Sequence, residues 1–276
     1  MNADGSVWAI GYGGPSSTYV DLMCHDDDDD VVDSDWIVSQ RIKIPKAYRE
    51  MFYHFFGSVV VMDATASRIA ISAQGANNDG VNVGKVFVYE KTYKKGVLKY
   101  RCVLEIDPPG GGVSGMSFGH SMAMTLTGNR LYVGSFSTRN PEGGNQHPAR
   151  VHEYALVYEE NKLVARLEYI FEALDKQSSG YMGAISLNAD ANILAIGIPT
   201  QNEVRVYRRH DVSGEWQYDQ TVVHPGGSVD LFGKQVILSQ NGERMLVSHE
   251  RPRFHFLMGD GVPDDAIVEL SLFSID

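Results

Sequence analysis

The sequence predicts an all-β fold, a β-propeller of about five four-stranded blades, and two observations carry this prediction. Short apolar runs that end in Gly or Ser recur along the chain, with last residues at positions 11, 72, 134, 197 and 248. The steps between them are 61, 62, 63 and 51 residues, a spacing that indicates a repeat architecture. Other runs in each unit alternate with period two, as half-buried strands require. Short antiparallel strands repeated radially form the blades of a propeller.

Four kinds of strand are expected in each unit. First strands begin with Phe-Gly or a related pair, at residues 56–61, 118–123, 181–186 and 232–237. Second strands are the apolar runs, at residues 7–11, 69–72, 131–134, 194–197 and 245–248. Third strands are rich in β-branched and aromatic residues, at 19–22, 86–89, 151–156 and 204–207. Fourth strands are more polar, at 36–42, 100–104, 163–167 and 216–220. Polarity rises from the first strand of a unit to the fourth, which predicts a sheet with a buried inner edge and a solvated outer edge.

The terminal units are expected to be incomplete. The first unit, residues 1–50, lacks a Phe-Gly strand, and the last, residues 229–276, has a third strand at 266–273 and no fourth. The complete units are residues 51–112, 113–176 and 177–228. We therefore expect a single propeller domain whose open blades pair across the ring or are completed by chain beyond one end.

The glycines of the Phe-Gly pairs are predicted to have a structural reason. Gly57, Gly119 and Gly233 are placed at the starts of inner strands, where a side chain would collide with neighbouring backbone. The alternative is that these glycines only relieve turns.

Composition argues against several classes of protein. A net charge of -11 argues against sequence-independent binding to nucleic acid or to anionic membranes. No apolar run approaches the roughly 20 residues that span a bilayer, and the N-terminus lacks the basic region of a signal peptide. Cys24 and Cys102 are expected to be thiols, because two cysteines in a chain of this length imply no disulfide framework. The sequence does not indicate a compartment.

The order of these elements resembles the FG-GAP repeats of integrin alpha-chain-like β-propellers. Residues 85–89 (KVFVY), 203–207 (EVRVY) and 215–217 (EWQ) match that pattern best. The resemblance implies adhesion, scaffold or enzyme-appended roles. Calcium-binding members of that family carry an Asp-rich loop between the first two strands, where this chain has only short turns, at residues 63–67, 127–129, 188–191 and 240–243. The family's calcium sites are therefore not expected here.

One acidic run is the candidate cation site. Asp26, Asp28 and Asp30 lie in the hairpin between a third and a fourth strand, where alternate carboxylates suit a calcium ion. The run lacks the glycine and terminal glutamate of an EF-hand, so a solvated acidic hairpin is the favoured interpretation, with contact to a basic partner as a further alternative. No other cofactor is expected.

Catalysis is not the favoured interpretation. Long loops carry His54, His147, His224 and His249, but no ligand spacing, nucleophile elbow or phosphate-binding loop accompanies them. One connection, residues 45–52, is predicted to be helical, since proline begins it and apolar residues follow at helical spacing.

The sequence therefore predicts a binding or scaffold module that recognises a protein or another macromolecule. The candidate binding residues are Tyr12, Asn77, Asn78, Arg139, Asn140, His147, His120 and Lys234. One alternative is a structural subunit whose open blades are completed by neighbouring chains, including copies of itself. The other is an enzyme or carbohydrate-binding propeller with a site at the central axis.

Overall fold

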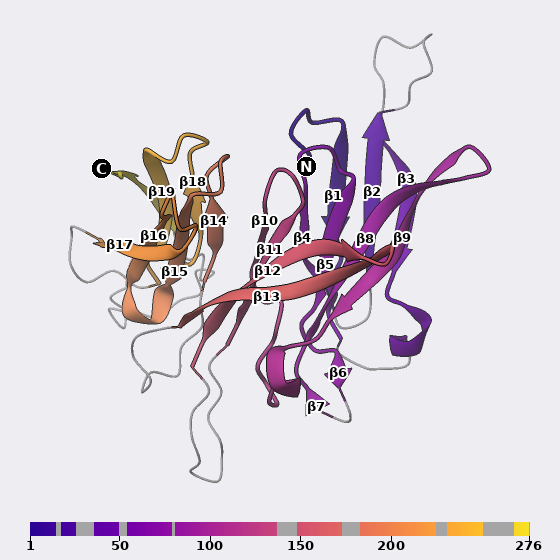
Figure 1. Ribbon diagram of the computed structural model, residues 1–276, viewed down its shortest axis with the longest axis horizontal. Coiled ribbons are helices and arrows are strands. Elements are labelled where there is room, and N and C mark those ends of the chain that lie inside the picture. The colour runs from indigo at the N-terminus through magenta and orange to yellow at the C-terminus, as the bar shows by residue number, and fades with distance from the viewer. Residues whose placement is uncertain are drawn as a thin grey trace, which may run out of the picture. The chain divides into compact units, whose positions relative to one another are not determined.

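The computed structural model describes residues 1–14, 18–25, 36–49, 54–78, 81–136, 148–172, 183–224, 231–250 and 268–275. These residues form antiparallel sheets with three single-turn 3-10 helices, η1 (Lys46–Tyr48), η2 (Pro109–Gly111) and η3 (Pro199–Gln201). The chain divides into two compact units, residues 1–172 and 173–276 (Figure 1). Each unit is taken separately.

Three sheets build the first unit. The first sheet has the order β1 (Val7–Gly11), β2 (Tyr19–His25), β3 (Trp36–Lys43). The second has the order β4 (Phe56–Met62), β5 (Arg68–Ala73), β8 (Lys85–Lys94), β9 (Val97–Ile106), with a small hairpin of β6 (Asn77–Asn78) and β7 (Val81–Asn82) between its middle strands. The third has the order β10 (Met122–Met124), β11 (Arg130–Ser135), β12 (Arg150–Glu159), β13 (Lys162–Glu172).

Two sheets build the second unit. The fourth sheet has the order β14 (Ile185–Leu187), β15 (Ile193–Ile198), β16 (Glu203–Arg209), β17 (Trp216–Val223). The fifth has the order β18 (Val236–Leu238), β19 (Arg244–Glu250), β20 (Val268–Ser274). The predicted strand order is confirmed, and within the described residues the first and fifth sheets have three strands each.

A recurring β-bulge gives structural support to the repeat. The register between third and fourth strands shifts at the same place in four sheets, at Leu22/Met23, Val88/Tyr89, Glu153/Tyr154 and Val206/Tyr207. A bulge increases local twist, so its repetition gives these sheets a similar curvature.

The Phe-Gly pairs correct one prediction and confirm its physical reason. Gly119 and Gly233 lie in turns before β10 and β18 rather than in strands, with φ of +89° and +91°, and Gly57 has φ +90° at the start of β4. A Cβ at Gly57 would lie 3.0 Å from the Tyr19 oxygen, and one at Gly233 would lie 2.8 Å from the Glu203 oxygen. Both oxygens belong to the preceding sheet. These glycines therefore serve the turn and the close approach of two sheets together.

The predicted gradient of burial is only partly right. The second and third strands are the most buried, as in β5, where five of six residues are buried, while most of β4 is half-exposed. The fourth strands are largely solvated, as predicted. Each first strand lies at an edge of its sheet, whereas the second and third strands are flanked by a strand on both sides.

The sheets within each unit pack face to face with a consistent composition. In the first core cluster the aliphatic Val20, Leu22 and Ile42 of the first sheet meet Phe56 and Phe87 of the second. In the next, second-sheet residues Val86, Val88 and Ile106 join Phe118 and Tyr154 of the third. In the second unit, fourth-sheet residues Val204 and Val206 join Phe232 and Phe273 of the fifth. Aliphatic residues of the later sheet belong to the same clusters, among them Ile69, Leu131 and Val247, so each interface combines an aliphatic face of one sheet with a mixed aliphatic and aromatic face of the next.

The predicted helix at residues 45–52 is described only in part. The single-turn η1 forms at Lys46–Tyr48, and residues 50–52 lie outside the described residues. The Tyr48 ring meets Phe87 edge-on at 5.3 Å, and its hydroxyl donates to Glu105 Oε2 at 2.6 Å. The connection therefore covers one face of the second sheet.

We expect the stability of the first unit to fall as the pH drops from 6.5 towards 4. His152 is buried against Phe118, and its burial lowers the pKa of the imidazole from 6.5 to about 4. Between these values the unfolded chain binds a proton that the native state does not, so the loss is about 3 kcal/mol. Val133 pairs with His152 in the third sheet, and Ile71 pairs with Phe87 at the equivalent position of the second sheet. His152→Phe therefore gives the third sheet the residue that the second sheet already has there. Urea unfolding at several pH values should show this pH dependence in the wild type and lose it in His152→Phe; equal slopes would contradict the assignment.

Candidate functional site

Several of the sequence-predicted site residues are placed only by their backbone or not at all. Asn77 and Asn78 form β6, where they pair with Asn82 and Val81 of β7. The candidate binding residues Arg139, Asn140 and His147 lie outside the described residues. The same holds for the candidate cation ligands Asp26, Asp28 and Asp30.

Three predicted residues are described with their surroundings. His120 is half-buried with its ring 4.2 Å from that of Phe136, and burial lowers the pKa of its imidazole. Lys234 is exposed directly after Gly233. Tyr12 is 41% exposed directly after β1. These residues come from the third, fifth and first sheets, and Tyr12 belongs to a larger exposed surface.

The histidines near the fifth sheet lie close together. The ring centroids of His224 and His249 are 4.4 Å apart, and both rings adjoin Phe232. His249 is buried, with its Nε2 3.2 Å from the Ser271 hydroxyl. Among the described residues no three His, Cys, Asp or Glu side chains form a group that would hold a metal ion. This pair is therefore part of the packing around an aromatic core residue.

The exposed surface around Tyr12 follows from strand alternation in the first sheet. Ala9 points into the core shared with the second sheet, so Trp8 and Ile10 point the other way. The register places Met23 opposite Trp8 and Asp21 opposite Ile10, and these two residues face the same side. We call this surface the aromatic face; it consists of Trp8, Ile10, Tyr12, Tyr19, Asp21, Met23, Trp36, Val38 and Arg41.

Ring contacts hold the aromatic face in order. The ring centroids of Trp8 and Trp36 are 5.3 Å apart, and the Trp8 indole donates a hydrogen bond to the Gly5 oxygen at 3.2 Å. The rings of Tyr12 and Tyr19 stack at 4.6 Å. Trp8 remains 44% exposed. Large rings that are already positioned lose little conformational entropy on binding.

A bidentate ion pair lies in the middle of this face. Arg41 Nε and Nη2 donate to the two oxygens of Asp21, each at 2.7 Å, and the guanidinium carbon lies 3.9 Å from the centroid of the Tyr19 ring. The hydrogen bonds to Asp21 raise the pKa of Arg41. Asp21 itself is buried, and the two hydrogen bonds from Arg41 balance its negative charge. The pair presents a fixed cation over an aromatic ring, an arrangement suited to binding rather than to bond cleavage.

A pocket lies in the second unit. It has a volume of about 460 Å³ and is lined by the start of β15, the end of β16 and the hairpin that follows, including Arg208, Arg209 and His210. Arg208 donates to Asp219 at 2.7 Å, and Arg209 lies 4.8 Å over the Trp216 ring. Both guanidiniums are thus already engaged within the sheet.

The turns between first and second strands are short, as predicted. Asp63 Oδ1 accepts hydrogen bonds from the backbone of Thr65 and Ser67, at 3.1 and 2.8 Å. Asn188 Oδ1 likewise accepts from the backbone of Asn192 and Ile193. The side-chain oxygens of these two turns therefore hold the turns themselves.

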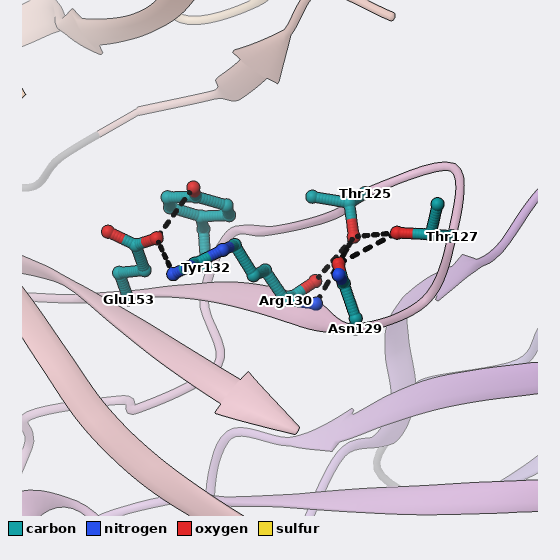
Figure 2. A network of polar contacts seen from close by, with 6 residues as sticks. All are labelled: Thr125, Thr127, Asn129, Arg130, Tyr132 and Glu153. Atoms are coloured by element: carbon teal, nitrogen blue, oxygen red, sulfur yellow. Dashed lines mark hydrogen bonds and ion pairs between the residues drawn. The ribbon is translucent and has the colours of Figure 1, made fainter. Parts of the chain in front are cut away.

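A buried polar network in the third sheet was missed by the sequence reasoning. Figure 2 shows Arg130 and the Tyr132 hydroxyl converging on Glu153 Oε1, at 2.6 and 3.0 Å. Glu153 is fully buried. On the other side of Arg130, its backbone N–H donates to Thr125 in the adjoining turn. The network links the turn to the middle strands and has a structural role.

Cys24 and Cys102 are free thiols in the structure. Burial raises the pKa of the Cys102 thiol to about 11, so this group is protonated at neutral pH and a poor nucleophile.

Sequence comparison does not place the chain in a family. No family model matches it, and no curated protein matches it either. Solved structures do match. The β-propeller domain of Cps50 (Swd1) from Myceliophteria thermophila has a TM-score of 0.55 at 10% identity, over 98% of this chain and 67% of that one.

Two further structures are similar to a comparable degree. KlAtg21 in complex with the coiled coil of AgAtg16 has a TM-score of 0.54 at 12% identity, over 88% of this chain and 60% of that chain. A putative 6-phosphogluconolactonase from Bacteroides uniformis has a TM-score of 0.53 at 11% identity, over 96% of this chain and 70% of that chain.

The chain has the β-propeller fold. It spans roughly two thirds of the length of the propeller chains that it matches. At such low identity the likeness establishes the fold alone. In the part of the chain that the structure describes, no helix is long and apolar enough to cross a membrane.

The residues that sequence reasoning missed had a recognisable signal. Trp8 and Ile10 alternate with Val7 and Ala9, so the run at residues 7–11 is apolar on both sides. A strand that is apolar on both faces is expected to contact another surface through each face. Among the described residues, only the face that carries Ala9 packs into a core.

Proposed function

We propose that this chain is a non-catalytic binding or scaffold module of the FG-GAP type, and that it docks a protein partner on the aromatic face. The observation that carries the proposal is the preorganised set of exposed Trp8 and Tyr12 with half-buried Trp36, beside Arg41. Trp, Tyr and Arg are the residues that most often dominate the binding energy of protein interfaces.

Other observations support the proposal. The glycine turns at residues 57, 119 and 233 suit the FG-GAP resemblance, because each brings a Phe-Gly pair against the preceding sheet. Two structural neighbours, Swd1 and Atg21, are propellers, and Atg21 was solved with a coiled-coil partner. The proposal needs no cofactor and no nucleic acid.

We expect Trp8→Asp to lose partner proteins that the wild type captures. An aromatic anchor of an interface contributes about 2 kcal/mol, so affinity should fall about thirtyfold. Immobilised wild type and variant would be exposed to native extract, and the bound proteins compared by quantitative mass spectrometry. Val97→Asp is the matched control, because Val97 is 54% exposed and begins β9 of the second sheet, outside the aromatic face. Equal capture by wild type and Trp8→Asp would contradict the proposal.

A second candidate function rests on the pocket beside Arg208 and His210. A guanidinium and an imidazole suit an anionic small molecule, and one propeller neighbour is a putative 6-phosphogluconolactonase. Turnover of a sugar lactone that disappears in Arg208→Ala would favour this enzyme class over the binding module.

A further inference from the structure

The hairpin that joins β8 to β9 concentrates positive charge in an acidic chain. Residues 91–101 (KTYKKGVLKYR) contain five Lys or Arg and no Asp or Glu, whereas the whole chain has a net charge of -11. All five cations are exposed. We call residues 91–101 the basic hairpin; its cations are Lys91, Lys94, Lys95, Lys99 and Arg101.

The cations of the basic hairpin have no carboxylate partner among the described residues. Eight other Arg and Lys side chains of the described structure do pair with a carboxylate. Glu90, the acidic residue next to the hairpin, is already engaged by Arg68 and by the Tyr158 hydroxyl. Unpaired charges of one sign repel one another, so an anionic ligand would remove a cost that the free protein carries.

The backbone of the basic hairpin is preorganised. Its strands pair as far as Lys94 and Val97, and the two residues between them, Lys95 and Gly96, have φ of +52° and +78°. A two-residue turn with two positive φ values matches the twist of the strands that it joins and fixes their register. The backbone positions of the cations are therefore set before a ligand arrives.

Three of the cations form a row on one face of the hairpin. Lys99 pairs with Thr92, and Lys94 lies two residues beyond Thr92 on the neighbouring strand. Arg101 lies two residues beyond Lys99, a separation of about 7 Å along the strand. An extended peptide repeats its own side chains at the same spacing. Carboxylates at alternate positions of such a peptide would therefore meet successive cations of the row.

The basic hairpin belongs to a sheet whose two neighbours lie in the same unit. The second sheet shares one core cluster with the first sheet and another with the third. The Gln40 side chain of the first sheet bonds to both the backbone N–H and the backbone oxygen of Tyr100. With both neighbouring sheets in place, the hairpin cations remain exposed.

We propose that the basic hairpin binds a short, extended acidic segment of a partner protein. This inference goes beyond the proposed function, because it uses the second sheet and no residue of the aromatic face. Charge complementarity and the spacing of the row name the ligand chemistry. The Debye length is about 8 Å at physiological salt, so a short segment responds to the hairpin itself. A long polyanion such as nucleic acid would also meet the negative charge of the rest of the chain.

The test measures the binding of a fluorescein-labelled peptide of alternating glutamate and serine by fluorescence anisotropy. We expect the full chain to bind this peptide, less tightly as salt is raised, and not to bind the corresponding glutamine–serine peptide. Lys99→Gln combined with Arg101→Gln should weaken binding about fivefold, because two exposed ion pairs are lost. No binding by the wild type would overturn the inference.

Lys43→Gln combined with Lys46→Gln is the matched control. Both residues are exposed in the same unit, and the pair removes the same charge. Lys46 begins η1, whose Tyr48 contacts Glu105 at the end of β9 that lies away from the hairpin. This variant should bind the peptide as the wild type does. Equal weakening by the two double variants would mean that only net charge matters, and would exclude a site at the hairpin.

Two further measurements identify the source of the acidic segment. Asp26→Asn, Asp28→Asn and Asp30→Asn together remove carboxylates of this chain that lie outside the described residues. A gain in peptide affinity of about tenfold or more would mean that the chain's own tethered carboxylates compete for the hairpin, and would overturn the assignment to a partner. A smaller change supports that assignment. An oligothymidine that binds more tightly than the peptide would assign the hairpin to nucleic acid instead.

The outcomes for the basic hairpin and for the aromatic face are distinguishable. Val97→Asp places a carboxylate opposite Lys94 and should weaken peptide binding, whereas it leaves the aromatic face unchanged. A protein held by the aromatic face is lost in Trp8→Asp and retained in Val97→Asp. Failure of the peptide to bind therefore removes this inference alone, and loss of Trp8-dependent capture removes the proposed function alone.

Discussion

Gly233→Ala is expected to destabilise the second unit by about 3 to 4 kcal/mol. Two separate effects add up here. The backbone has φ +91°, which disfavours any residue with a Cβ, and that Cβ would lie 2.8 Å from the Glu203 oxygen of the preceding sheet. Because the obstacle is backbone rather than the end of a flexible side chain, the two sheets must separate to relieve it.

Gly214→Ala is the matched control for this prediction. Gly214 has φ +70° in the same unit, but nothing lies within 4 Å of the position its Cβ would take. It should lose only the conformational part, about 1 kcal/mol. The difference between the two variants in urea unfolding isolates the cost of sheet separation. Equal losses would show that the glycine serves the turn alone.

Arg130→Met is expected to destabilise the first unit by about 3 kcal/mol. Glu153 is fully buried in the third sheet, and Arg130 Nη1 lies 2.6 Å from its Oε1. Methionine keeps much of the side-chain volume but removes the positive charge. The buried carboxylate then loses its charged partner, which costs more than a hydrogen bond between neutral groups.

The control is an ion pair of similar length at the surface. Arg166 Nε lies 2.7 Å from Glu159 Oε1, and both side chains are largely exposed. Arg166→Met should change stability by less than about 1 kcal/mol, because solvent already screens that pair. Denaturant unfolding of both variants gives the comparison. A loss in Arg130→Met no larger than in Arg166→Met would mean that Glu153 depends on its other contacts.

Much of the fold was predictable because it depends on local periodicity. The β-branched run at residues 86–89 and the polar run at 100–104 alternate with period two, and they lie within β8 and β9. The first strands were harder. Phe118-Gly119 reads as the start of a strand, yet its glycine adopts a positive φ in a turn, and β10 begins only at Met122. Local pattern does not reveal that a neighbouring sheet occupies the space.

Only one residue of the candidate site was predicted from the sequence. Tyr12 was placed among the binding residues, but the residues that give its surface a shape, Trp8, Trp36 and Arg41, were not. Trp8 and Trp36 are distant in sequence and meet at 5.3 Å because the outer strands of one sheet bring them together on one face. Arg41 reads as an ordinary polar residue of a fourth strand until the register sets it opposite Asp21.

The sequence by itself determined the repeat and the strand order, because strand alternation and glycine positions are local properties of the chain. The tertiary structure alone decided which apolar residues meet another sheet and which remain exposed. Burial depends on what packs against each face. For that reason Val20 and Trp8, both apolar and both in the first sheet, end in a core and on an open surface respectively.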